Sequence, residues 1–107
     1  MEFDVSLKIY HDYFINEHLF HWQSQNSTTP ESAVGQAYIN QPNTKKEILL
    51  FVREATTDEN SLRMAFVFCG RLNFVKNEGR KPMNITWELE SQPPALLFNE
   101  GLKLRVG

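Results

Sequence analysis

Short apolar stretches separated by turn residues run along most of the chain. The clearest strand covers residues 84–90, NITWELE, where Ile85, Trp87 and Leu89 alternate with polar residues. Because successive side chains of a strand point to opposite faces, this pattern predicts one buried face and one polar face. Further strands are expected at residues 6–15, 19–25, 46–55 and 63–75. The stretch at 46–55 is apolar on both faces and is expected to be central, and Gly70 predicts a bulge or bend in the last one.

One segment, residues 31–38, has helical spacing. Ala33 and Ala37, and likewise Val34 and Tyr38, lie four positions apart, which predicts a short helix that packs through one face. The preceding Thr29-Pro30 is typical of an N-cap followed by proline in the first turn.

Together these elements predict an α+β domain, a small and partly closed β-barrel of short, mainly antiparallel strands with one short helix. Turns are expected at residues 41–44, 56–61 and 76–82, and the chain after Pro93-Pro94 is expected to add a final turn or short strand.

The composition fits one folded domain, since 41% of the 107 residues are hydrophobic and 12% are aromatic. The formal net charge of −2 does not itself require a polyanionic partner, so nucleic-acid binding would need local basic patches. The single cysteine, Cys69, lies in an apolar run and predicts a buried, reduced thiol in a cytoplasmic protein. No apolar run reaches the roughly 18 residues of a membrane span and no signal-peptide pattern is present, so membrane association is not expected.

The stretch from Phe20 to Pro30, FHWQSQNSTTP, combines a tryptophan with many hydrogen-bonding side chains. Residues 6–15 and 19–25 are expected to form a hairpin. If its turn is centred between Glu17 and His18, paired residues have numbers that sum to 35. One face then carries the pairs Ile15 with Phe20, Tyr13 with Trp22, and His11 with Ser24, and the other carries Phe14 with His21, Asp12 with Gln23, and Tyr10 with Gln25. A three-residue turn would shift the pairing by one position and break this arrangement.

The second face of this hairpin suits a planar ligand rich in heteroatoms. A nucleobase needs an aromatic plate for stacking, together with groups that match its donor and acceptor edge. A carboxylate can accept from an exocyclic amine such as cytosine N4, and a glutamine amide can both donate and accept. The expected base-pocket residues are Tyr10, Asp12, Tyr13, His21, Trp22, Gln23 and Gln25. Alternatively, the polar groups of this face satisfy one another and bind nothing.

Other chemistry finds less support in the sequence. His11, His18, His21 and Asp12 do not have the spacing of a known metal site, so no metal is expected. Ser24 opposite His11 lies in no nucleophile elbow, and no glycine-rich phosphate loop is present. We therefore expect a protein that is not an enzyme and has no cofactor.

The turn at residues 76–82 carries three basic groups, Lys76, Arg80 and Lys81. At the tip of a turn they are candidates for contacts with nucleic-acid phosphates. The alternative is a charged turn that only prevents unwanted pairing of strand edges.

From residue 10 onward, the stretch YHDYFINEHLFHWQSQNST resembles a C-terminal domain of bacterial proteins that combine a phospholipase-D-type nuclease with a DEAD/DEAH-type helicase. Type IV, modification-dependent restriction enzymes are among these proteins. Further matches follow in the family's order: VGQAYIN, LLFVRE, CGRLNFV, EGRKPMNITWEL and QPPALL. The family pattern falls on Tyr10, His11, Asp12, Tyr13, Phe20, His21, Trp22, Gln23, Ser24, Gln25, Gly35, Phe51, Arg53, Glu54, Gly70, Gly79, Pro82 and Trp87.

The resemblance implies a reader domain similar to the SRA and wider PUA-like β-barrels, which flip a modified cytosine into an aromatic-lined pocket. The expected function is therefore recognition of a modified base, 5-methylcytosine, in duplex DNA, with the helicase and nuclease segments of a parent protein as partners. Alternatively, the chain is a structural or protein-interaction domain that docks onto a helicase or associates with itself.

The family region has more chain before the YHDY motif, including another strand, whereas nine residues precede it here. An excised fragment or a short version with an exposed sheet edge is therefore expected, and such an edge favours a homodimer.

Overall fold

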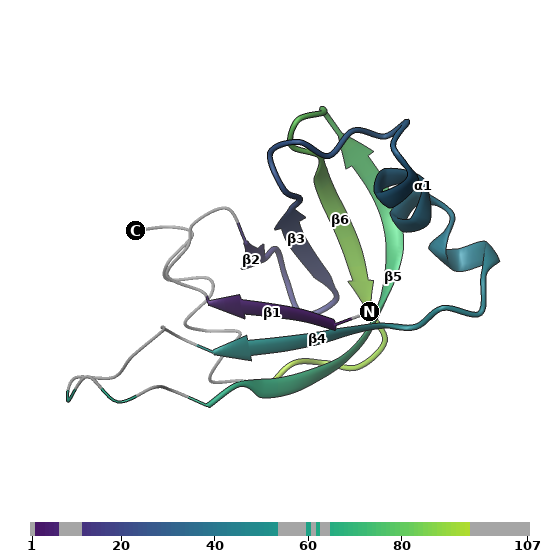
Figure 1. Ribbon diagram of the computed structural model, residues 1–107. Helices are drawn as coiled ribbons and strands as arrows, with labels where there is room; N and C mark the ends of the chain where they lie inside the picture. Colours follow the sequence, from purple (N-terminus) through teal and green to yellow (C-terminus); the bar gives the residue numbers. More distant parts are fainter. Residues whose placement is uncertain (1, 7–11, 54–59, 61, 63–64, 95–107) are drawn as a thin grey trace.

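The computed structural model describes residues 2–6, 12–53, 60, 62 and 65–94. Six strands form one sheet in the order β1-β4-β5-β6-β3-β2. The strands are β1 (Glu2–Ser6), β2 (Tyr13–Phe14), β3 (Leu19–Gln23), β4 (Ile48–Arg53), β5 (Val67–Glu78) and β6 (Asn84–Leu89). The five strands from β4 to β2 pair antiparallel, whereas β1 pairs parallel with β4. The sheet curls into a half-barrel, and the helix α1 (Ala33–Ile39) lies beside one end of it (Figure 1).

This architecture confirms the predicted α+β domain with a partly closed, mainly antiparallel sheet. In β6, Ile85, Trp87 and Leu89 are buried, while Glu88 is exposed on the other face, as the alternation predicts. Strand β4 has neighbours on both sides, β1 and β5, which agrees with its predicted central position.

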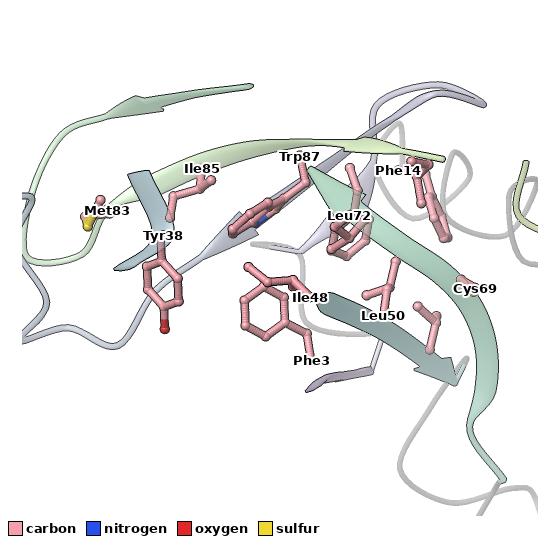
Figure 2. Packing of buried hydrophobic residues seen from close by; sticks show 13 residues of the cluster. Phe3, Phe14, Tyr38, Ile48, Leu50, Cys69, Leu72, Met83, Ile85 and Trp87 are labelled. Carbon is pink, nitrogen blue, oxygen red and sulfur yellow. The ribbon is translucent and has the colours of Figure 1, made fainter. Parts of the chain in front are cut away.

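The core fills the inside of the half-barrel (Figure 2). Phe3 of β1 lies flat against Trp22 of β3, with ring centroids 4.2 Å apart and an interplanar angle of 10°. Tyr38 of α1 meets both rings edge-on, and so links the helix to the same cluster. Since β1 and β3 are not neighbours in the sheet, the Phe3–Trp22 stack spans the interior and holds the two sides of the half-barrel together.

Two bulges bend β5. The register with β4 shifts between Leu49 and Phe51, opposite Gly70, whose φ of 93° favours glycine. The bulge predicted at Gly70 is thus confirmed. A second shift, between Phe74 and Lys76, leaves Val75 as the extra residue in the pairing with β6.

The helix begins later than predicted. Its N-cap is Ser32, whose Oγ accepts a hydrogen bond from the Gly35 N–H at 3.0 Å, so the N-cap predicted at Thr29 is wrong. The Thr29 carbonyl instead accepts hydrogen bonds from the N–H and the hydroxyl of Ser32, at 3.1 and 2.7 Å. The chain therefore makes one more turn before the helix starts. The turn predicted at 41–44 contains a 3-10 helix, η1 (Gln41–Asn43).

The first strand also differs from the prediction. A strand was expected from Ser6 to Ile15, but Ser6 ends β1 and only Tyr13 and Phe14 form β2, with residues 7–11 outside the described ones. Strand β1 lies before the YHDY motif and was not predicted as a separate strand. The predicted final turn or strand after Pro94 lies outside the described residues. Within the described residues, no helix is long and apolar enough to span a membrane.

Candidate nucleic-acid interface

The hairpin of β2 and β3 is paired one residue away from the prediction. Tyr13 pairs with His21 and Phe14 with Phe20, so the numbers of paired residues sum to 34 rather than 35. The cause is the turn, in which the Asn16 carboxamide oxygen accepts hydrogen bonds from the N–H groups of His18 and Leu19, at 2.8 and 2.9 Å. An asparagine side chain that bonds the backbone in this way stabilises a tight turn, here of three residues.

This register reverses the faces of β2 but not those of β3. As predicted, Phe20 is buried and Trp22 packs against the core, while His21 lies on the opposite, outer face of the sheet. On β2, however, Phe14 is the buried residue and Tyr13 joins His21 on the outer face. The Tyr13 and His21 rings are stacked, with centroids 4.8 Å apart and an interplanar angle of 17°.

A hollow of about 310 Å³ lies on the outer face of β2, β3, β6 and β5. Paired residues of antiparallel strands have side chains on the same face, and the pairs His21 with Thr86 and Thr86 with Lys76 extend the Tyr13–His21 row across four strands. We call this site the outer hollow; it is lined by Tyr13, Ile15, His21, Lys76, Glu78, Asn84 and Thr86.

The outer hollow offers several kinds of contact. The stacked Tyr13–His21 pair supplies aromatic surface. Asn84 supplies an amide, whose Oδ1 accepts a hydrogen bond from Gln23 Nε2 at 3.2 Å. Lys76 Nζ lies 3.4 Å from Glu78 Oε1, but both side chains are more than half exposed. An exposed ion pair is weak, so both charges are available to a ligand.

Only part of the predicted base pocket meets at the outer hollow. Tyr13 and His21 line it and Gln23 adjoins it through Asn84. Trp22 instead packs on Phe3 in the core. The Asp12 carboxylate accepts a hydrogen bond from the backbone N–H of Gln23 at 2.9 Å. Gln25 is exposed in the loop after β3, and Tyr10 lies outside the described residues.

Four lining residues were not predicted: Ile15, Glu78, Asn84 and Thr86. Two of them had a signal in the sequence, because the alternation in residues 84–90 places Asn84 and Thr86 on the polar face of their strand. What the sequence did not indicate was that this strand lies beside β3.

The predicted phosphate contacts have different surroundings. Lys76 lies within β5, which continues to Glu78, so its predicted position in the turn is wrong; it lines the outer hollow. Arg80 forms an exposed ion pair with Glu31 at 3.3 Å, and Lys81 lies exposed in the turn that follows β5. The Lys81 backbone N–H donates to the Thr28 carbonyl at 3.0 Å. This contact joins the turn to the polar loop after β3.

Ser24 has a structural role. Its hydroxyl accepts a hydrogen bond from the Met83 N–H at 2.8 Å and donates to the Gln25 carbonyl at 3.1 Å, and the residue is buried. His11, its predicted partner, lies outside the described residues. Among the residues that are described, no three His, Cys, Asp or Glu side chains come together as a metal site.

Fold and site together define a small, curled β-sheet domain with one helix and an open polar and aromatic hollow on the outer face of its sheet. Residues 3–100 match the model of the family described as Domain of unknown function (DUF3427), and the chain belongs to this family. A search of curated proteins found no match. The family match covers both strands of the hairpin and the strands that complete the outer hollow.

Proposed function

We propose that the chain is a nucleic-acid-binding reader module of the SRA-like or PUA-like kind. In this proposal it recognises a modified base, 5-methylcytosine, by base flipping in a modification-dependent restriction or helicase system. The observation that carries the proposal is the stacked Tyr13–His21 pair in an open hollow that also holds amide, hydroxyl, carboxylate and ammonium groups.

These groups match the parts of a flipped nucleotide. The Tyr13–His21 pair provides an aromatic surface for the base, and stacking on such side chains contributes about 1–3 kcal/mol per base. Glu78 can accept from the exocyclic amine of cytosine, and Asn84 can donate or accept at the ring edge. Ile15 offers an apolar contact for a 5-methyl group, and Lys76 can meet the adjoining phosphate.

The size and energetics of the outer hollow suit a single base. Its volume of about 310 Å³ lies at the small end of ligand pockets, which span roughly 300–1,000 Å³. Extruding a base from a duplex costs a few kcal/mol, which one stacking contact and two or three hydrogen bonds are sufficient to offset.

Fluorescence polarisation tests the proposal, with a duplex that carries one 5-methylcytosine and an otherwise identical unmodified duplex at the same salt concentration. The protein is expected to bind the methylated duplex more tightly. His21→Ala removes half of the stacked pair and should weaken that binding about 5- to 150-fold, the equivalent of 1–3 kcal/mol.

His18→Ala is the matched control, because it also removes one histidine but at an exposed position in the hairpin turn. Its affinity should equal that of the unmutated protein. Equal affinity for the two duplexes would overturn recognition of the modified base.

A structural or protein-interaction domain is the second candidate function. Phe51 of β4 and Phe68 of β5 are paired neighbours with ring centroids 5.1 Å apart, and Phe68 is 54% exposed. Next to them the Arg53 guanidinium lies 4.2 Å from the centre of the Phe66 ring. Exposed aromatic surface of this kind is typical of protein contacts. A stable dimer that does not bind DNA in light scattering and titration would favour this function, and a DNA-binding monomer would exclude self-association.

A further inference from the structure

A second hollow, of about 240 Å³, lies at the start of β4 between η1 and β5. It is lined on one side by residues 44–48 and on the other by residues 71–73 of β5, with Glu90 beside them. Three basic side chains, Lys45, Lys46 and Arg71, line this site, which we call the basic hollow.

The floor of the basic hollow is held by the buried side chain of Gln41. Its Oε1 accepts a hydrogen bond from the Phe74 N–H at 2.9 Å, and its Nε2 donates to Asn73 Oδ1 at 3.3 Å. The Asn73 amide in turn donates to Glu90 Oε1 at 3.1 Å. Because these bonds tie η1 to β5, the segment that carries the two lysines is anchored to the sheet.

The charges of the basic hollow leave a positive excess. It contains three cations, Lys45, Lys46 and Arg71, and two carboxylates, Glu47 and Glu90, which is a net charge of +1. Arg71 is paired with Glu47 at 3.2 Å, and Glu90 accepts the bond from Asn73. Lys45 and Lys46 are exposed, and neither has a carboxylate within 4.0 Å among the described residues. Two ammonium groups therefore remain for an anion.

The basic hollow and the outer hollow lie on the same face of β5. Arg71 belongs to the first and Lys76 to the second, and both side chains point to the outer face, because the bulge at Val75 restores the alternation between them. Four to five residue steps of a strand separate them by about 15 Å. A stretch of roughly four nucleotides, the shortest site size of single small β-barrel domains, is long enough to reach both.

We infer that the basic hollow binds a backbone phosphate of the same nucleic-acid strand whose base enters the outer hollow. The inference rests on the proposed function and extends it from a base site to a strand path along the outer face of β5. In this arrangement Lys45 and Lys46 contribute to the affinity for DNA, whereas the outer hollow discriminates between bases.

The test is the salt dependence of DNA binding by the double variant Lys45→Gln/Lys46→Gln, measured with the same two duplexes over a series of salt concentrations. Each lost phosphate contact lowers the slope of log K against log salt by about 0.7–0.9. The double variant is expected to lower the slope by about 1 to 2 and to weaken binding of the methylated and unmodified duplexes by the same factor.

The matched control is Ala33→Glu/Val34→Glu, which lowers the net charge by the same two units at exposed positions of α1. Acidic residues in the first turn of a helix are well tolerated. This control should keep the slope of the unmutated protein. An unchanged slope in the lysine variant, or an equal decrease in the control, would overturn the inference.

The same data separate this inference from the proposed function. Equal binding of both duplexes with a smaller slope in the lysine variant refutes recognition of the modified base but supports the phosphate contact. A preference for the methylated duplex with no change in slope supports recognition of the modified base but refutes the phosphate contact. If the unmutated protein does not bind DNA at low salt, both are wrong.

Discussion

Gly35 is the position at which the structure makes its sharpest prediction about stability. This residue lies buried in α1, directly against the backbone of the loop that precedes the helix. A methyl group at Gly35 would overlap the carbonyl oxygen of Thr29 and would lie 3.1 Å from Met83 Sδ. Because the first obstacle is backbone, no change of side-chain rotamer relieves the overlap.

The size of the effect follows from opposing contributions. In the interior of an unhindered helix, alanine is about 1 kcal/mol more favourable than glycine. Here the loop must move, and overpacking of this kind costs about 1–3 kcal/mol. The movement also weakens the bonds from Ser32 to the Thr29 carbonyl and from Lys81 to the Thr28 carbonyl, each contributing about 1 kcal/mol. Gly35→Ala should therefore lower the free energy of unfolding by about 2 kcal/mol.

Urea unfolding followed by tryptophan fluorescence measures this difference, since Trp87 is fully buried. Val34→Ala is the control at the neighbouring position, because Val34 is 49% exposed and alanine has the higher helix propensity. The control should be neutral or slightly stabilising. A Gly35→Ala variant that is as stable as the unmutated protein, with the same denaturant slope, would refute the close approach of α1 to the loop.

Two further predictions concern buried groups. Ser24→Ala leaves the buried N–H of Met83 without its acceptor and should lower the free energy of unfolding in urea by about 1–3 kcal/mol. The control Ser27→Ala, in the exposed loop, should change the stability little. Equal stabilities of the two variants would contradict the structural role of Ser24. Burial raises the pKa of the Cys69 thiol from 9.0 to about 11. The buried neutral thiol therefore contributes fully to the free energy of unfolding below pH 9, and this contribution is lost as the pH rises to 11. Iodoacetamide at pH 8 should label the folded protein far more slowly than the urea-unfolded chain, and equal rates would argue against this burial.

Strands with a clear local sequence signal, such as hydrophobic alternation or a glycine within an apolar run, were predictable from the sequence. The alternation in residues 84–90 identified both faces of β6, and the glycine within a long apolar run located the bulge in β5. Both features depend on local rules, since a strand alternates wherever one of its faces is buried and glycine allows a positive φ.

The hairpin register depended on a single side chain. Asn16 and its two backbone hydrogen bonds select a three-residue turn, and that turn moves Tyr13 from the predicted core face to the outer face. Hydrophobicity could not decide between the two registers, because Tyr13 and Phe14 are both aromatic and either could face the core. The strand β1 was not predicted for a different reason. Its partner β4 is more than forty residues away in the sequence, and no local sequence pattern indicates that two such segments pair parallel.

The outer hollow shows why a site can be hidden even when two of its strands, β3 and β6, are correctly assigned. The polar faces of β3 and β6 were both predicted, yet a site forms only because β6 lies between β3 and β5 in the sheet. This order brings Gln23 to Asn84 and His21 to Thr86, residues more than sixty positions apart in the chain. A test confined to the hairpin would therefore miss half of the site. In the polarisation titration that tests the proposed function, Asn84→Ala and Thr86→Ala should also weaken binding of the methylated duplex, because both residues line the outer hollow together with His21.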